Sequence, residues 1–399
     1  MSQETASDRF ARYSRAIRGE PLPLALIDLD ALERNVVAVV SPARERGKTV
    51  RLASKSLRSI DLLRRIQALA EKQSGSVRGV MAYCAAEASF LAGEGWDDIL
   101  IAYPSALEND ARLVAAANAK GAIVRPVCDA GAHLAALSAA ATAAGTTIPV
   151  VVDVDVAYRA FGAHLGVRRS PLHDVGEVVA FVKRVRATEG LSFGGLLAYE
   201  AHIAGLADTL ATRAMKVFVR GSLISHRRAV ADALAREGIV LPLFNGGGTG
   251  SIGWTADEGP ITEVAAGSGF LTSHLFDRYQ DLRLEPAVCF ALQVARKPAP
   301  GFVTCLGGGF VASGSAGPDR LPRPYLPAGL RLTKMEGAGE VQTPLLVPAD
   351  VDVPLGSPVF FRHAKTGELS EHFNEYLLVR GERIEGRATT YRGAGKAFL

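Results

Sequence analysis

Lys55 is a residue whose type and position could support covalent chemistry. It stands in residues 51–56, at the end of an apolar run that is typical of a buried strand. At the mouth of a barrel of strands a lysine amine is partly desolvated, which lowers its pKa and makes it a nucleophile able to form a Schiff base with an aldehyde cofactor. A solvated lysine at the start of a loop is the alternative, and position alone leaves it open.

Two glycine-rich runs follow late apolar segments and are candidates to bind a phosphate. They occupy residues 245–251 and 266–269. Glycine lets backbone N–H groups converge on an anion, and the phosphate site of (β/α)8 barrels typically follows the seventh and eighth strands. Ordinary tight turns are the alternative. The cofactor-binding candidates in these runs are Gly246, Gly247, Gly248, Thr249, Gly250, Ser251, Gly267, Ser268 and Gly269.

Polar side chains also follow two other apolar runs. Tyr199 and His202 come after one of them and are candidates to contact a ring or a substrate. Asp153 and Asp155 end the other, and three arginines follow, namely Arg159, Arg168 and Arg169. An arginine there can position a carboxylate or a phenolic oxygen of a cofactor. We take Tyr199 and Arg159 as cofactor-binding candidates and His202 as a reserve catalytic group. Loop polar groups and structural ion pairs are the alternatives.

The last candidates lie in the C-terminal part of the chain. His363 and Lys365 alternate on one face of an expected strand, which suits a lid over a site, and Glu371 and His372 follow closely. We take His363 and Lys365 as candidate catalytic residues. The alternative is a purely structural role, which is the more common one for a single histidine.

Alternating strands and helices must position these residues. Apolar runs interleaved with helical stretches are typical of a parallel sheet covered by helices, and about eight such units over roughly 250 residues favour a closed (β/α)8 barrel. The predicted barrel domain spans residues 20–278. We expect strands at residues 24–30, 49–54, 79–83, 98–103, 123–129, 149–155, 193–199, 241–247 and 261–268.

The pattern changes after about residue 280, where glycine, proline and short β-like runs dominate. We expect a separate, mainly antiparallel β domain over residues 279–399, with residues 1–19 as a candidate addition to it. The predicted fold class is therefore α/β, a TIM-like barrel with a C-terminal β domain.

Composition excludes several classes of protein. Of the 399 residues, 48% are hydrophobic and 22% are charged, which supports a large core and argues against a disordered chain. The net charge of +4 without a long basic block argues against nucleic-acid binding. The four cysteines form no C-x-x-C pair, and residues 1–20 lack the apolar segment of a signal peptide. We therefore expect a cytoplasmic protein with no membrane partner.

Taken together, these residues resemble the alanine-racemase-like pyridoxal 5'-phosphate (PLP) enzymes, and more narrowly the D-serine dehydratase and D-threonine aldolase group. The resemblance rests on the opening strand at residues 22–30, on the R-x-x-x-K-S pattern of residues 51–56, and on residues 86–104. It implies that Lys55 holds PLP, and that the chain forms a homodimer in which the β domain of one copy closes the site of the other.

The resemblance also implies an activity. It predicts a lyase that acts on a small β-hydroxy amino acid of D configuration, either by dehydration with release of ammonia or by retro-aldol cleavage. Lys55 is then the expected base at Cα, with His363 and Lys365 at the β-oxygen. Two alternatives remain, namely an amino-acid racemase with a second base such as Tyr325, and a non-catalytic PLP-binding protein. The β domain argues against the second, since such carriers tend to lack one.

The chain departs from the group at the metal site. Members often hold zinc or manganese through a His-x-Cys or His-x-Asp pair, but the matching residues here are His363, Ala364 and Lys365. An ammonium group is a poor ligand and repels a dication. His363 is thus the only matching ligand, and two hypotheses follow. Either Lys365 takes the electrophilic role of the metal, or His363 recruits Glu371 or His372 as a further ligand.

Overall fold

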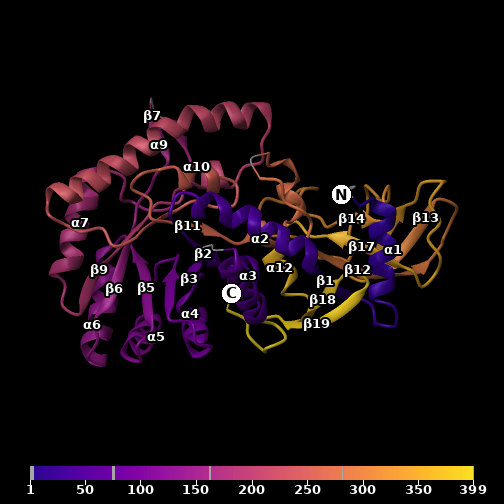
Figure 1. Ribbon diagram of the computed structural model, residues 1–399, viewed down its shortest axis with the longest axis horizontal. Helices are drawn as coiled ribbons and strands as arrows, with labels where there is room; N and C mark the ends of the chain where they lie inside the picture. The colour runs from indigo at the N-terminus through magenta and orange to yellow at the C-terminus, as the bar shows by residue number, and fades with distance from the viewer. Residues whose placement is uncertain (1–3, 74–76, 161–162, 281, 399) are drawn as a thin grey trace.

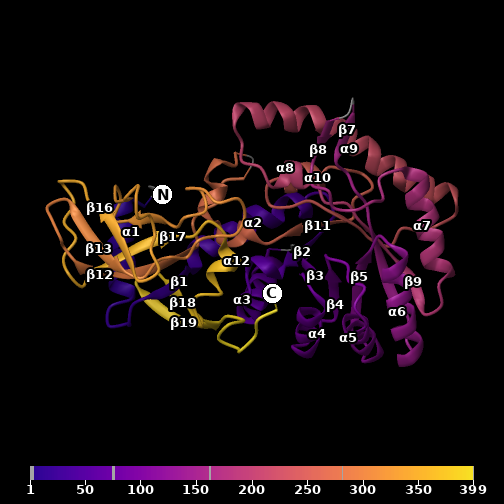
Figure 2. The same cartoon turned by 180° about the vertical axis from the view of Figure 1, so that it is seen from behind.

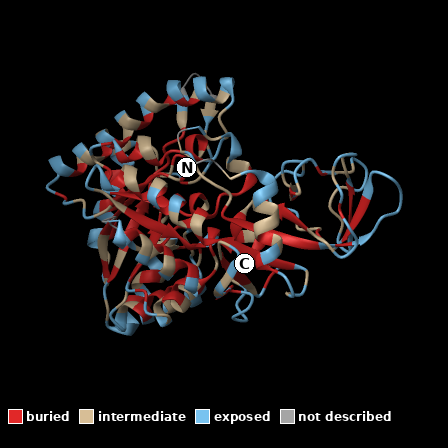
Figure 3. Cartoon of the chain, turned by 45° about the vertical axis from the view of Figure 1, so that its right-hand side comes forward, coloured by how far each residue is buried: buried red, intermediate tan, exposed pale blue. Residues whose placement is uncertain are grey.

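The computed structural model describes residues 4–73, 77–160, 163–280 and 282–398. A barrel surrounded by helices lies at one end of the molecule, and a β domain lies at the other (Figures 1 and 2). Buried residues fill the barrel and the inner faces of its helices, and exposed residues cover the outer faces (Figure 3). Within the described ranges, no helix combines the length and apolar composition needed to cross a membrane.

The barrel consists of parallel strands that close on themselves. Over the described ranges the strand order is β10-β11-β2-β3-β4-β5-β6-β9. These strands are apolar because helices cover their outer face and side chains fill the inside. Their bounds are β2 (Thr49–Ala53), β3 (Val77–Ala82), β4 (Asp98–Ile101), β5 (Ile123–Cys128), β6 (Ile148–Asp153), β9 (Leu191–Leu197), β10 (Phe244–Gly246) and β11 (Glu263–Ala266).

The covering helices alternate with these strands along the chain. Side-chain caps mark several of their starts; for example, Ser59 accepts a hydrogen bond from the backbone of Leu62 at the start of α3. The long helix α9 crosses the barrel beside α7 (Figure 1). The helices of the barrel are α2 (Leu29–Arg44), α3 (Ile60–Lys72), α4 (Ala85–Gly93), α5 (Glu108–Ala119), α6 (Gly131–Ala144), α7 (Val175–Ala187), α8 (Ala201–Ala204), α9 (Leu210–Arg236), α10 (Ile252–Ala256) and α11 (Ser268–Leu271). The short elements are η1 (Ser54–Ser56), η2 (His274–Arg278) and the hairpin β7 (Tyr158–Ala160) and β8 (Ala163–Leu165).

The β domain is built on one large sheet. Its strand order over the described residues is β15-β16-β13-β12-β1-β18-β19, and β17 pairs with β12 and β14. The predicted fold class, a barrel with a mainly antiparallel C-terminal domain, is confirmed. The elements are α1 (Ala6–Ala16), β1 (Leu24–Asp28), β12 (Val288–Arg296), β13 (Phe302–Leu306), β14 (Arg323–Leu326), β15 (Arg331–Leu332), β16 (Gln342–Leu346), β17 (Pro358–Arg362), α12 (Thr366–Leu369), β18 (Glu375–Arg380) and β19 (Arg383–Thr389).

The start of the predicted barrel needs correction. The first strand of the predicted range 20–278, β1, pairs antiparallel with β12 and parallel with β18, so it belongs to the large sheet of the β domain. The first strand of the barrel is therefore β2. The helix α1 packs on the same sheet, where Tyr13 contacts the ring of Phe360. An apolar run buried at every position predicts a strand, but it does not say which of two sheets the strand joins.

Candidate active site

Lys55 lies at the carboxyl end of the barrel. Strand β2 ends at Ala53, and the 3-10 turn η1 then carries Lys55 into a cavity of about 390 Å³. Arg51 lies within β2 and is buried inside the barrel, whereas Lys55 follows the end of the strand and lies at the barrel mouth. Other residues that line the cavity are Ser56, Arg58, Met81, Tyr83, Tyr103, Arg169, Tyr199, Asn245, Gly247, Gly248, Thr249, Gly267, Ser268, Tyr279, Lys365 and Glu368.

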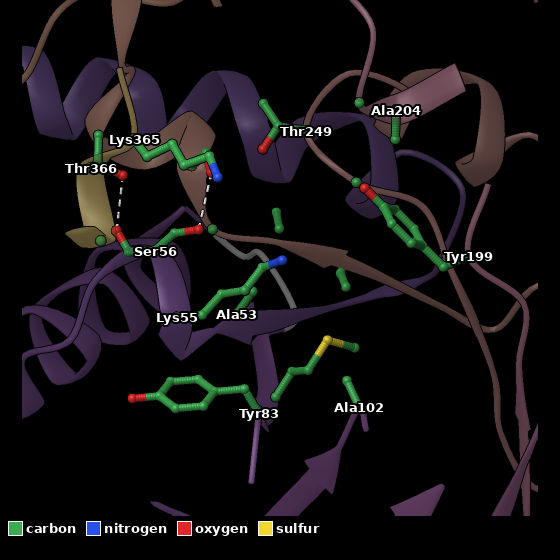
Figure 4. Close-up of a pocket in the computed structure, with 18 of the residues that line it drawn as sticks. Ala53, Lys55, Ser56, Tyr83, Ala102, Tyr199, Ala204, Thr249, Lys365 and Thr366 are labelled. Atoms are coloured by element: carbon green, nitrogen blue, oxygen red, sulfur yellow. Dashed lines mark hydrogen bonds between the residues drawn. The ribbon is translucent and has the colours of Figure 1, made fainter. Parts of the chain in front are cut away.

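Hydrogen bonds from both domains hold the turn that carries Lys55. Ser54 Oγ donates to the carbonyl of Met81 in β3 at 2.8 Å. Thr366 Oγ1, from the β domain, donates to the carbonyl of Ser56 at 2.9 Å, and Ser56 Oγ lies 3.0 Å from Ser268 Oγ (Figure 4). The amine of Lys55 therefore projects from a fixed backbone, which suits a group that must reach one reacting atom.

Arg51 is buried in the barrel interior, where its guanidinium pairs with two acidic residues. It is 1% exposed. Its guanidinium donates to Glu263 at 2.6 and 3.0 Å and to Asp98 at 2.9 Å. Asn245 donates to the same Glu263 carboxylate at 2.6 Å. Because both acids pair with it, Arg51 supports the floor of the cavity and does not itself line the cavity.

The two glycine runs meet beside the turn that carries Lys55, but only part of each reaches the cavity. Gly247, Gly248, Thr249, Gly267 and Ser268 line it, whereas the other candidates do not. These others are Gly246, Gly250, Ser251 and Gly269, which pack behind the lining residues.

Gly250 shows why a glycine is needed behind the lining. A Cβ atom there would lie 2.2 Å from Cε1 of Tyr279 and 2.4 Å from the carbonyl oxygen of Ala204. We expect Gly250→Ala to lower the free energy of unfolding by about 1–3 kcal/mol, since a backbone oxygen cannot move aside. Gly253→Ala in α10 is the matched control, because nothing lies within 4 Å of its added methyl group. Equal unfolding midpoints in urea for the two variants would contradict this steric explanation.

Glu200 is a buried carboxylate that organises the first glycine run, and sequence reasoning missed its role. It is 0% exposed and accepts hydrogen bonds from the backbone N–H of Gly247 at 3.0 Å, from Ser251 Oγ at 2.6 Å and from Thr255 Oγ1. It also pairs with the buried Arg227. Burial alone would raise the pKa of Glu200, but the charge of Arg227 and the hydroxyl donors keep that pKa below its usual range. The sequence had already made its neighbour Tyr199 a candidate, so it pointed to this segment but not to Glu200 itself.

The arginine of the cavity is Arg169 and not the candidate Arg159. Arg169 donates to the carboxylate of Asp153 at 2.9 Å and to the carbonyl of Ala102 at 2.6 Å. Its guanidinium carbon lies 5.2 Å from the ring centre of Tyr103. Arg159 pairs instead with Asp155 and lines a separate, smaller pocket. The sequence offered several arginines after β6 and no signal to choose between them.

The candidate histidines lie behind the cavity wall. His202 is buried in α8 and does not line the cavity. His363 is 1% exposed, and its Nδ1 accepts from the backbone N–H of Lys365 at 3.0 Å. Lys365 itself does line the cavity. The possible racemase base, Tyr325, receives a hydrogen bond from Arg9 and is not among the lining residues.

A buried carboxyl beside the cavity predicts a pH dependence of stability. Glu87 in α4 accepts from the backbone N–H of Tyr83 at 2.8 Å and from the hydroxyl of Tyr391 at 2.9 Å. Burial raises the pKa of Glu87 to about 7. The unfolded chain therefore releases this proton at lower pH than the folded chain, so stability falls as pH rises from about 4.5 to 7.

Glu87→Gln tests this dependence because glutamine resembles the protonated acid. We expect the variant to gain stability relative to the natural chain between pH 4.5 and 7, with a total change on the order of 3 kcal/mol. Urea unfolding across this range measures it. Glu189→Gln, at an exposed turn, is the control and should show no such trend. A constant difference between Glu87→Gln and the natural chain at all pH values would refute the raised pKa.

Comparison with known proteins agrees with this geometry. Residues 27–272 match the family model "Alanine racemase, N-terminal domain". The chain belongs to this family. The resemblance drawn from the sequence is therefore confirmed. In this chain one cavity is lined both by the lysine at the barrel mouth and by parts of the two glycine runs.

Individual relatives narrow the comparison. A 3-hydroxy-D-aspartate aldolase of Paracoccus denitrificans (strain Pd 1222) is 31% identical over 250 residues, which are 62% of this chain and 59% of the relative. The chain thus matches about three fifths of that aldolase. A D-threonine aldolase of Arthrobacter sp. is 28% identical over 309 residues, covering 75% of this chain and 76% of the relative.

Solved structures share the whole fold. The D-threonine aldolase from Filomicrobium marinum superposes with a TM-score of 0.80 at 22% identity, covering 94% of this chain and 95% of that one. The D-threo-3-hydroxyaspartate dehydratase from Delftia sp. HT23 superposes with a TM-score of 0.75 at 19% identity, covering 94% of this chain and 98% of that one. At these identities the likeness establishes the fold, including the β domain.

Proposed function

We propose that this protein is a PLP-dependent lyase that acts on a small β-hydroxy D-amino acid, by dehydration with loss of ammonia or by retro-aldol cleavage. The observation that carries the proposal is the position of Lys55, whose amine enters a cavity that the Gly247–Thr249 and Gly267–Ser268 edges also line. The named activities of the matched relatives, aldolases and a dehydratase of β-hydroxy D-amino acids, support the choice of reaction and substrate class.

The cavity suits the cofactor in size and charge. Its volume of about 390 Å³ falls in the range of small-molecule sites. The charged residues that line it are Lys55, Arg58, Arg169 and Lys365 on the positive side and Glu368 on the negative side. This excess of positive charge complements a ligand that carries a phosphate and a substrate that carries a carboxylate.

Specific residues are proposed to hold the cofactor. Lys55 would bind it covalently through its amine, and the Gly247–Thr249 and Gly267–Ser268 edges would bind its phosphate through backbone N–H groups and hydroxyls. A Cβ on Gly267 would lie 2.7 Å from the carbonyl oxygen of Ala53, so this edge approaches the Lys55 turn closely only because it has no side chain there. Tyr199 lies on the far side of the cavity from Lys55 (Figure 4). When bound, the cofactor supplies an electron sink for negative charge at Cα.

The residues of the chain supply binding and proton transfer. The Lys55 amine, once free, is the proposed base for the Cα proton. Met81, Ala82 and Leu197 provide an apolar wall that keeps water from the reacting carbon. Lys365 enters from the β domain and is the proposed partner of the substrate β-oxygen. His363 does not line the cavity; it contacts the backbone of Lys365 and would position that residue.

A substrate panel tests the proposal. The purified protein is scanned for the visible absorbance of bound PLP and then assayed with D-serine, D-threonine and 3-hydroxy-D-aspartate for ammonia, glycine and aldehyde. Ammonia together with a keto acid identifies dehydration, and glycine together with an aldehyde identifies retro-aldol cleavage. Interconversion of alanine enantiomers without either set of products would instead establish a racemase.

We also propose a cytoplasmic homodimer. The four cysteines are all free, and three of them are buried, which suits a reducing compartment. The exposed side chains of Leu210 and Phe218 on α9, with exposed fractions of 91% and 65%, support an association between copies. Light scattering of the purified protein measures the number of copies.

A further inference from the structure

The fold family implies a metal ion beside the cofactor. The residues around His363 show whether this chain has the ligands to hold one. A solved variant of a D-threo-3-hydroxyaspartate dehydratase with this fold is described as being in the metal-free form. By the resemblance drawn from the sequence, His363 and Lys365 stand where members of the group often have a pair of metal ligands. Among the described residues, no group of three or more His, Cys, Asp or Glu side chains is arranged to hold a metal ion.

The donor atoms near His363 do not fit a divalent ion. Its Nδ1 contacts the backbone of Lys365, and its buried Nε2 has no hydrogen-bond partner within the described ranges. The ring of His372 lies 6.4 Å away, centre to centre, and it stacks on Phe310 at 4.4 Å. Glu371 pairs with Arg58. Glu371 is thus engaged elsewhere, and the two imidazoles have no third His, Cys, Asp or Glu beside them to complete a metal site among the described residues.

A fixed ammonium group is found at this position instead. Lys365 Nζ donates to Ser313 Oγ at 2.6 Å and lies 3.3 Å from Glu368 Oε1. The backbone N–H of Ser313 donates to the other oxygen of Glu368 at 2.7 Å, which fixes the serine against the acid. An ammonium group has three N–H donors, and these two contacts use two of them. The third is available to an oxygen in the cavity that Lys365 lines.

We propose that the Lys365 ammonium replaces the divalent metal in this chain and donates a hydrogen bond to the β-oxygen of the substrate. The inference rests on the proposed lyase function. In dehydration the β-oxygen leaves as hydroxide and takes a proton from the ammonium group, whereas in retro-aldol cleavage the free Lys55 amine takes the proton of the β-hydroxyl before the Cα–Cβ bond breaks. Both reactions thus place negative charge on that oxygen, and a preorganised cation stabilises such charge. Ser313 and Glu368 hold the ammonium in place, so no exchangeable ion is needed.

The first experiment measures metal in the natural holoenzyme. We expect no stoichiometric zinc or manganese by mass spectrometry, no heat of binding when Mn²⁺ or Zn²⁺ is titrated, and unchanged activity after dialysis against EDTA. One tightly bound ion per chain overturns the proposal, as does activity that EDTA removes and Mn²⁺ or Zn²⁺ restores. The metal content and the titration need no substrate, so they test this inference even if the lyase assay fails.

The second experiment changes the cation. We expect Lys365→Met to lower kcat by about 100-fold while the visible spectrum of bound PLP persists, and Lys365→Arg to retain more activity than Lys365→Met. Lys297→Met is the matched control, because Lys297 is exposed and pairs with the exposed Asp352. An unchanged kcat in Lys365→Met overturns the proposal. Loss of the PLP spectrum in Lys55→Ala tests the cofactor site separately.

Discussion

Replacing Lys55 with alanine is expected to remove both the visible absorbance of bound PLP and the lyase activity. The amine of Lys55 is the proposed covalent attachment of the cofactor and the proposed base at Cα, so one substitution removes two functions. We expect kcat to fall by at least about 1,000-fold. Stability should change by less than about 0.5 kcal/mol, because the side chain extends into the cavity and supports no packed core.

The measurement is an absorbance scan and a steady-state assay on the same preparation. Lys183→Ala is the control, since Lys183 is an exposed lysine on α7 that pairs with Glu237. A Lys55→Ala protein that keeps the absorbance and the activity would show that another residue binds the cofactor. Thermal unfolding of both variants shows whether a loss of absorbance and activity comes from the missing amine or from a failure to fold.

The second large effect is expected at Glu200. Glu200→Ala leaves the Arg227 guanidinium buried without one of its two carboxylates, which typically costs about 3–5 kcal/mol. It also removes the acceptor for the backbone N–H of Gly247 and for Ser251, so the first glycine run loses its support. We expect PLP to bind at least about 10-fold more weakly, because that run forms part of the proposed phosphate site.

Glu200→Gln keeps the prediction testable if the alanine variant does not fold. The amide retains the size of the side chain but loses its charge, so weaker PLP binding should persist with a smaller loss of stability. Glu237→Ala is the control, since it removes one partner of an exposed ion pair. PLP affinity is measured by equilibrium dialysis. An unchanged affinity in Glu200→Gln would show that the charge of Glu200 does not support the phosphate site.

Local patterns predicted the barrel and made Lys55 a candidate, and the resemblance to a known family then singled Lys55 out. Burial makes parallel strands apolar, and Lys55 follows directly after the apolar run of β2, at the carboxyl end where a barrel has its mouth. Glycine runs after late strands predicted a second edge of the cavity. These features depend on interactions within a strand or a turn, so a short segment of sequence carries them.

Side chains that act across the fold could not be chosen this way. Arg159 and Arg169 follow the same strand, and only the paths of the chain around Asp153 and Asp155 bring Arg169 to the cavity. Glu200 was adjacent to a candidate, but its partners come from α9, α10 and the glycine run. Such roles depend on which segments meet, and sequence spacing does not contain that information.

The sequence by itself determined the barrel, the β domain, the lysine at the mouth and the absence of a second acidic or thiol ligand at position 365. Tertiary structure decided the rest. It placed β1 in the large sheet, because strand pairing depends on which edges are free when the domains assemble. It also buried His363 and carried Lys365 into the cavity, because the β domain packs its α12 turn against η1 through Thr366 and Ser56.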